Sequence, residues 1–269
     1  MLFSPSAPGG FVVTSHAGDN DLAAKDYVRA RLGIAPGMTL KPAQLAPARR
    51  EQDAPGEQDP SPDGTACALR IWREAEPAAG SPVEAYLARR GLSLPNVAHE
   101  VIRYASACPF AGTRTPAMVA LVRSVSTDTP QAIHRTALTR DGRKAVVNGR
   151  DRLALGGLRG GAVKLTADAE VTYCLGIGEG IESTLSLRHL PEFGNSPVWA
   201  LLNTAGVAGF MPLSAIESLW LAVDHDPGGE KAARACAGRW RFAGKETFLI
   251  TPDAPGTDCN DLLTEALDG

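Results

Sequence analysis

Two short acidic stretches in this chain have the residue types and spacing for metal-dependent chemistry. The first, Gly178–Glu182, places Glu179 between two glycines, and the second, Asp224–Gly229, begins Asp-His-Asp. Each stretch directly follows a short apolar run, at residues 171–177 and 219–223. Because Mg²⁺ is usually held by one or two carboxylates plus substrate phosphates, the two stretches together predict a Mg²⁺-dependent phosphoryl-transfer site.

The elements that must position these acids follow from the pattern around them. Both apolar runs are short and rich in β-forming residues, which is typical of buried parallel strands. Strand and helix patterns alternate from residue 171 onward, so we expect a βαβαβαβ order and a three-layer parallel α/β sheet. Each acidic stretch would then lie at the carboxyl end of a strand, the edge where open α/β sheets bind ligands. The expected strands are 171–177, 198–202, 219–223 and 246–250, and the expected helices are 181–190, 207–213 and 230–242.

Each acidic residue has a proposed role with an alternative beside it. Asp224 and Asp226 are the expected Mg²⁺ ligands, although Asp226 also has the position of a helix N-cap before Pro227. Glu179 is a general acid or base or a metal ligand, or else a first-turn residue that complements a helix dipole. Glu182 is either a second ligand or a surface residue. Asp258 is an accessory metal ligand, with helix capping near residues 260–261 as the alternative.

The charge distribution indicates a polyanionic partner. Residues 101–165 carry eleven Lys or Arg against three acids, whereas residues 166–269 carry six basic and fifteen acidic residues. Cationic side chains engage phosphates while carboxylates hold metal, although a solvated alternating surface would have a similar composition. We select Arg103, Arg135 and Lys144 as the expected phosphate contacts.

The sequence predicts four units along the chain. Residues 1–34 form a small unit, and residues 35–65 are rich in Pro, Ala, Gln and charge, which is typical of a flexible linker. Residues 66–165 form a basic α+β, β-rich subdomain, and residues 166–269 form the acidic α/β domain. Within the basic subdomain we expect helices at 66–76 and 82–90 and strands at 101–104, 117–125, 131–139 and 161–165.

Composition restricts the class of protein. A chain of 269 residues with 44% hydrophobic content can bury a substantial core. Five scattered cysteines without a Cys-x-x-Cys pair disfavour a disulfide framework and a zinc ribbon. Because no apolar run approaches about 18 residues, we expect a soluble, cytoplasmic protein without a membrane partner.

The acidic stretches resemble the signature of the Toprim domain, which is a Glu after the first strand and an Asp-x-Asp after a later one. Here these residues are Glu179, Asp224 and Asp226. The segment Gly256–Leu263 resembles the Asp-x-Asn-Asp-Leu-Leu element of primase-like members. The resemblance implies a Mg²⁺ (or Mn²⁺) site formed by these three residues and Asp258.

The resemblance extends to the region that precedes the Toprim domain in primase-like proteins of phages, plasmids and integrative mobile elements. Residues 10–19 are also similar to the tail of a zinc-ribbon module, but they lack its ligands, so residues 1–34 are interpreted as a remnant of it. The segments that carry the wider similarity are Gly80–Gly91, Ile102–Tyr104, His134–Leu138 and Gly160–Leu165.

Three functions remain open at this point. The resemblance implies a primase-like nucleotidyltransferase in DNA replication, acting on single-stranded DNA or RNA and nucleotides, with a separate helicase or zinc-ribbon protein as partner. A Toprim nuclease would use the same site with water as the nucleophile. A non-catalytic nucleic-acid-binding accessory or regulatory protein would retain the cluster for structure. The Gly-rich residues 156–161 do not have the spacing of an ATP-binding phosphate loop.

Overall fold

A computed structural model of the protein describes residues 2–3, 11–12 and 62–268. Strands β1 (Leu2–Phe3) and β2 (Phe11–Val12) form an antiparallel pair. The predicted amino-terminal unit, residues 1–34, and most of the predicted linker, residues 35–65, otherwise lie outside the described residues. The end of that linker was predicted wrongly, because helix α2 (Pro62–Glu74) begins there. The Thr65 hydroxyl donates to the carbonyl of Gln131 at 2.9 Å, a long-range contact that local composition does not reveal.

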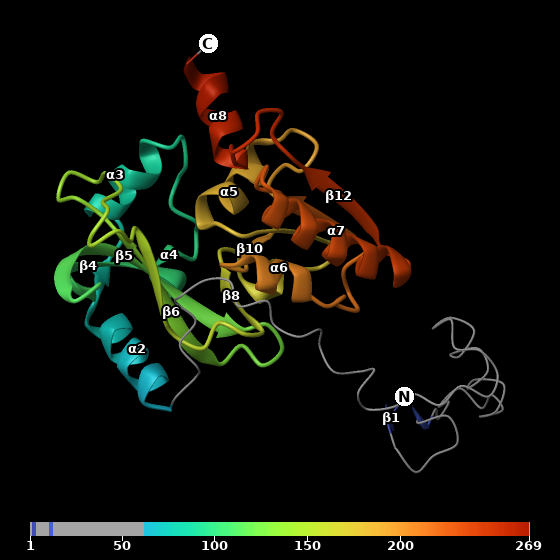
Figure 1. Ribbon diagram of the computed structural model, residues 1–269, viewed down its shortest axis with the longest axis horizontal. Helices are drawn as coiled ribbons and strands as arrows, with labels where there is room; N and C mark the ends of the chain where they lie inside the picture. The colour runs from blue at the N-terminus through green and yellow to red at the C-terminus, as the bar shows by residue number, and fades with distance from the viewer. Residues whose placement is uncertain (1, 4–10, 13–61, 269) are drawn as a thin grey trace. The chain divides into compact units, whose positions relative to one another are not determined.

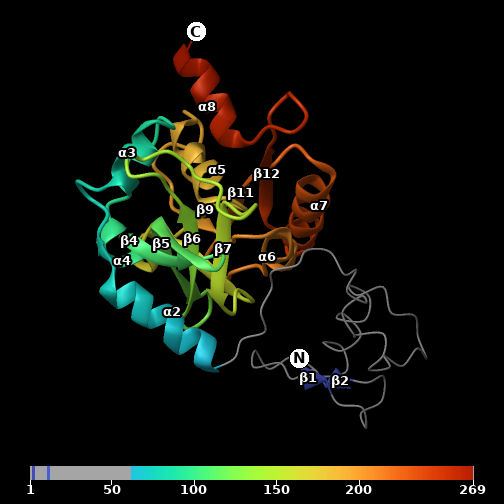
Figure 2. The same ribbon diagram turned by 60° about the vertical axis from the view of Figure 1, so that its left-hand side comes forward.

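Residues 62–268 belong to one compact unit, whose first part is built on an antiparallel meander of β4, β5, β6 and β7. Helix α2 packs against β6 and β7 on one face of this sheet (Figure 2). Ser81 caps α3 by accepting from the N–H of Val83, and Pro82 occupies the first turn, as predicted. The elements of this part after α2 are β3 (Glu76–Pro77), α3 (Pro82–Ala88), α4 (Ala98–Val101), β4 (Ile102–Phe110), β5 (Thr113–Ser124), β6 (Pro130–Ala137), β7 (Arg152–Gly156) and β8 (Gly161–Lys164).

The second part has the predicted parallel α/β order. Strands β12, β11, β9 and β10 lie side by side in that order and run parallel. Apolar residues of α5 and α8 belong to the core on one face of the sheet, and those of α6 and α7 belong to the core on the other face, so the layers number three (Figure 1). The elements are η2 (Asp168–Glu170), β9 (Cys174–Gly178), α5 (Ile181–Ser186), η3 (Leu187–His189), β10 (Val198–Ala200), α6 (Thr204–Gly209), β11 (Ser218–Ala222), α7 (Pro227–Phe242), β12 (Glu246–Ile250) and α8 (Cys259–Asp268).

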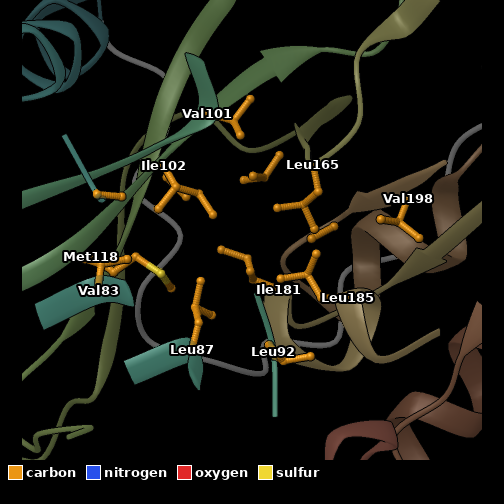
Figure 3. Packing of buried hydrophobic residues seen from close by; sticks show 14 of the residues in the cluster. Val83, Leu87, Leu92, Val101, Ile102, Met118, Leu165, Ile181, Leu185 and Val198 are labelled. Carbon is orange, nitrogen blue, oxygen red and sulfur yellow. The ribbon is translucent and has the colours of Figure 1, made fainter. Parts of the chain in front are cut away.

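The two parts share one sheet and one core. Strand β8 pairs antiparallel with β10 on one side and with the end of β5 on the other, so the sheet is continuous. A single buried cluster joins Val83, Ile102 and Met118 of the first part to Ile181 and Leu185 of α5 (Figure 3). The predicted boundary between residues 165 and 166 therefore falls inside one packed unit. Packing at this junction holds the first part, which is the basic one, against the second, acidic part.

Glycines in β9 allow the close packing around the central strand. A Cβ on Gly176 would lie 2.6 Å from Cζ of Phe193, and one on Gly178 would lie 2.6 Å from Oγ1 of Thr184 in α5. Only glycine fits at such distances. The start of α5, and with it Glu179, is thereby held against the strand end. Among the described residues, no helix has the length and apolar character needed to cross a membrane.

Candidate active site

Glu179 and Asp224 leave neighbouring parallel strands at the same level. Gly178, the last residue of β9, is paired in register with Ala222, the last residue of β11. Glu179 follows one strand directly, and Asp224 follows the other after Val223. Both side chains are partly buried. The sequence prediction that the two acidic stretches meet at the carboxyl edge of the sheet agrees with this register.

The loop after β11 gives its two aspartates different surroundings. Asp226 caps α7, because its Oδ1 accepts from the N–H of Gly229 at 2.8 Å and Pro227 follows at the first helical position. A Cβ on Gly229 would lie 2.5 Å from the carbonyl oxygen of Asp224, so the turn is tight. Oδ1 of Asp224 is buried and has no hydrogen-bond partner among the described residues. Asp226 thus has its predicted capping role, while Asp224 retains a buried oxygen without a partner.

Electrostatic repulsion couples the acids of this edge. Burial, followed by the charges of Asp224 and Asp226, raises the pKa of Glu179 to about 7. Burial, followed by the charges of Asp258 and Asp226, raises the pKa of Asp224 to about 6. The positive charge of Arg152 acts on both groups in the opposite direction. We call Glu179, Asp224, Asp226 and Asp258 the acidic cluster.

Asp258 combines capping with this electrostatic role. Its Oδ1 accepts from the N–H of Asn260 at 2.7 Å, and Oδ2 of Asp261 accepts from the N–H of Asp258 at 2.9 Å. These reciprocal bonds start α8 and hold the Asp258 carboxylate within electrostatic range of Asp224. The capping alternative is therefore present in the structure, and metal ligation by Asp258 stays a prediction.

The acidic cluster is better suited to a metal ion whose coordination shell is completed by substrate than to one held by protein ligands alone. Within residues 62–268, no three His, Cys, Asp or Glu side chains form a group that could hold a metal ion. Mg²⁺ commonly takes one or two carboxylates and completes its shell with phosphates and water. The unpartnered Oδ1 of Asp224 and the mutual repulsion of the acids are features that a divalent cation would relieve. Carboxylate oxygens are also the ligand type that this ion prefers.

Glu182 is buried, so the alternative that it is a surface residue is wrong, and both of its carboxylate oxygens face partners in the basic part. It is 2% exposed, and its Oε1 accepts from the Tyr86 hydroxyl at 2.6 Å. Its Oε2 lies 3.6 Å from Nη2 of Arg152. Burial raises the pKa of Glu182, but the charge of Arg152 and the hydrogen bond from Tyr86 outweigh burial and hold it below its ordinary value. Glu182 therefore ties the acidic part to α3 and β7 of the basic part.

Asn260 makes a second connection between the same two parts. Its Oδ1 accepts from Nη1 of Arg90 at 2.8 Å, and its Nδ2 donates to the Arg90 carbonyl at 2.9 Å and to Oγ of Ser186 at 3.1 Å. The side chain is 1% exposed and fully engaged. The two connections fix β7 and α3 beside the acidic cluster.

Arg152 lies at the candidate site but is not among the residues predicted from the sequence. It begins β7, its side chain is 35% exposed, and a Cβ on Gly180 would lie 3.9 Å from its Nη1. It therefore extends from the basic part towards the turn that carries Glu179. The sequence signal was present but weak, because β7 has only five residues and its first position lies among several other charged residues.

The three predicted phosphate contacts lie in different surroundings. Arg135 is 7% exposed and donates to the carbonyls of Pro109 and Ala154 at 2.6 and 2.8 Å, so it is a structural arginine and its selection as a phosphate contact is corrected here. Arg103 donates to the carbonyl of Trp72 at 3.1 Å and lies over that ring at 4.5 Å.

Lys144 is partly exposed and forms an ion pair. Its side chain is 28% exposed, and its Nζ pairs with Oδ2 of Asp151 at 2.6 Å. A partly exposed ion pair of this kind is weak and can be exchanged for a phosphate. Phosphate binding by Lys144 and Arg103 stays a prediction.

Comparisons with known families agree with this architecture. Residues 174–268 match the family model described as the Toprim domain, and residues 63–165 match one described as a domain of unknown function, DUF7146. The carboxyl-terminal part of this chain is therefore a Toprim domain, which confirms the predicted resemblance and fold class. Toprim domains generally bind divalent metals such as Mg²⁺. No match was found among curated protein sequences.

Several solved structures are similar to the chain. The primase fragment of the bacteriophage T7 primase-helicase protein is 16% identical, with 69% of this chain and 71% of that one covered and a TM-score of 0.48. A DNA primase domain from Pseudomonas aeruginosa is 12% identical over 75% and 74% of the two chains, with a TM-score of 0.44. The DnaG primase catalytic domain bound to single-stranded DNA is 13% identical over 76% of each chain, with a TM-score of 0.45. Identities and scores at this level do not assign a function.

Proposed function

We propose that this protein is a Mg²⁺-dependent (or Mn²⁺-dependent) nucleic-acid enzyme, and specifically a primase-like nucleotidyltransferase. The observation that carries the proposal is the meeting of the acidic cluster with a cationic side chain of the basic part. The acidic cluster of the Toprim domain lies at the carboxyl edge of the sheet, and Arg152 faces it from the basic part. An enzyme that joins nucleotides needs this combination, because it must hold several phosphates next to metal-binding carboxylates.

Asp224 and Asp226 would hold the metal, with Glu179 and Asp258 close enough to add charge. Once bound, the ion would neutralise the phosphates of the nucleotide and orient them for transfer. Oδ1 of Asp224 is available for this role because it has no partner among the described residues. Asp226 uses Oδ1 to cap α7, which leaves its other carboxylate oxygen for a ligand.

Glu179 is suited to proton transfer. In the proposed reaction, a 3′-hydroxyl oxygen forms a bond to the α-phosphorus, pyrophosphate leaves, and the hydroxyl proton passes to a base. A carboxylate with a pKa near 7 exchanges a proton readily at neutral pH, and burial together with neighbouring charge gives Glu179 that value. Gly180, which follows Glu179 and is partly exposed, adds no side chain between the backbone and an approaching phosphate.

Arg152 would bind the phosphates from the opposite side. A guanidinium presents two parallel N–H groups to a phosphate, and Glu182 keeps it beside the acidic cluster through a contact that is too long for a strong hydrogen bond. Lys144 and Arg103 would contact the nucleic-acid backbone. The substrates would be single-stranded DNA or RNA and nucleotides in the cytoplasm, with a separate helicase or zinc-ribbon protein as partner.

One assay tests this proposal and separates its alternatives. Labelled single-stranded DNA is incubated with ribonucleotides or deoxynucleotides and with Mg²⁺ or Mn²⁺. Extension supports the nucleotidyltransferase, and shortening identifies a Toprim nuclease. Retention of the strand without either product supports the non-catalytic accessory or regulatory protein.

A further inference from the structure

Eight buried side-chain polar atoms have no hydrogen-bond partner among the described residues, and three of them belong to residues on one face of the β6–β7 pair. These three are Nδ1 of His134, Oγ1 of Thr136 and Nε of Arg152. His134 is 9% exposed and Thr136 is 1% exposed. Buried polar groups without partners are rare and cost stability, so three such atoms in one place call for an explanation in function.

The three side chains extend from the same face of the β6–β7 hairpin. Thr136 is directly opposite Arg152 in the antiparallel register, and His134 lies two residues along the same strand, opposite Ala154. Directly opposite and diagonal neighbours on one face are within reach of a long side chain. Arg135, between them, extends from the other face and donates to Pro109 and Ala154.

The three atoms are chemically complementary. Nε of Arg152 carries a hydrogen and only donates, whereas the Thr136 hydroxyl accepts, as does Nδ1 of His134 in the tautomer protonated at Nε2. Burial, followed by the charge of Arg152, lowers the pKa of His134 to about 4, so its ring is neutral at physiological pH. One donor and two acceptors therefore lie together without being bonded in the present arrangement.

The contact that holds Arg152 to Glu182 is long. It measures 3.6 Å, and the Arg152 side chain is 35% exposed. A guanidinium that binds phosphate through its two terminal nitrogens directs its Nε–H sideways, and that hydrogen then needs an acceptor. Thr136 and His134 are placed to supply it.

We infer that Thr136 and His134 are positioning residues for Arg152, and that they accept its Nε–H when its terminal nitrogens turn to a nucleotide phosphate. This inference rests on the proposed function, because it assumes that Arg152 binds nucleotide phosphates. Without nucleotide, Arg152 stays on Glu182 and the two acceptors stay unbonded. With nucleotide, Nε–H gains an acceptor, either the Thr136 hydroxyl or Nδ1 of His134, and this bond favours the bound state.

The test uses near-isosteric variants of Thr136. In Thr136→Val the acceptor is lost but the shape is kept, whereas Thr136→Ser retains the hydroxyl. Thr166→Val is the matched control, because Thr166 is 4% exposed and its Oγ1 accepts from the N–H of Val198 at 3.0 Å. Thermal unfolding without nucleotide and the Kd for ATP and for inorganic triphosphate with Mg²⁺ are measured for each.

We expect Thr136→Val to keep or raise the Tm, because it removes an unbonded buried hydroxyl, and to weaken phosphate binding about tenfold. Thr136→Ser should bind almost like the unmutated protein. Thr166→Val should lower the Tm by several degrees and leave the Kd unchanged. In an Arg152→Ala background, Thr136→Val should have no further effect on the Kd.

Two results would overturn the inference while leaving the proposed function in place. One is a Thr136→Val protein that binds as tightly as the unmutated one, and the other is an effect of the same size with Arg152 absent. If the unmutated protein binds neither ATP nor inorganic triphosphate, the proposed function fails and the inference fails with it.

Discussion

Replacing Asp224 with asparagine should make the protein more stable at alkaline pH. Asp224 makes no hydrogen bond through Oδ1 among the described residues, and burial with the charges of Asp258 and Asp226 raises its pKa from 3.8 to about 6. Between these two values the folded state binds more protons than the unfolded state, so stability falls as pH rises through this window. The loss of stability caused by ionised Asp224 is complete above about pH 7, and Asp224→Asn removes it.

The size of the effect follows from the same shift. A carboxyl pKa raised from 3.8 to about 6 corresponds to roughly 3 kcal/mol of lost stability at high pH. Asp224 is only partly buried and shares its repulsion with its neighbours, so we expect a gain of about 1–2 kcal/mol. For a unit of this size that gain raises the Tm by about 2–8 °C.

The assay is urea unfolding in EDTA at pH 8 and at pH 4.5. The gain should be present at pH 8 and nearly absent at pH 4.5, with an unchanged m-value. Asp253→Asn serves as the control, because Asp253 is an exposed aspartate that does not contribute to the pKa shifts of the acidic cluster. An Asp224→Asn protein that is equally or less stable at pH 8 would refute the reasoning that these acids repel one another.

Three further predictions concern the supporting residues. Tyr86→Phe should lower the free energy of unfolding by about 1–3 kcal/mol, because it removes the hydrogen bond to Oε1 of the buried Glu182 carboxylate, whereas Tyr173→Phe at a 64% exposed position should have no effect in the same denaturation experiment. Arg135→Ala should lower the Tm and leave the salt dependence of single-strand binding unchanged. Lys144→Ala should leave the Tm unchanged and reduce the slope of log Kd against log salt concentration by about 0.7 per lost phosphate contact. Because the pKa of His134 is lowered from 6.5 to about 4, the unfolded state binds more protons between these values, and stability should fall by roughly 3 kcal/mol as pH drops through them. Comparison with His134→Gln over pH 7 to 4 isolates this contribution, and parallel curves for the two proteins would contradict it.

The carboxyl-terminal fold could be predicted because each of its signals is local. The apolar runs before Glu179 and Asp224 are long enough to identify β9 and β11, and the acids that follow them must lie at the carboxyl edge of a parallel sheet. The cap at Asp226 was predictable for the same reason, since Asp-Pro is a local helix-start signal.

The contribution of the basic part could not be predicted in this way. Whether an arginine in a strand is buried or faces the site depends on the face from which it extends, and that depends on pairing with strands distant in sequence. Arg135 and Arg152 look alike in sequence, yet the pairing of β6 with β7 puts the first against Pro109 and the second beside the acidic cluster. Glu182 was misjudged likewise, because its partner Tyr86 lies 96 residues away.

Metal-dependent turnover by the acidic cluster is tested by comparing the unmutated protein with a protein that carries both Asp224→Asn and Asp226→Asn. Each is incubated with labelled single-stranded DNA, nucleotides and Mg²⁺ or Mn²⁺, and strand binding is measured separately without metal. We predict that the unmutated protein extends the strand, and that the double variant shows no turnover but binds the strand equally well or more tightly, because two repelling charges are gone. Extension by the double variant at the unmutated rate, or no metal-dependent product from either protein, would contradict catalysis at this site.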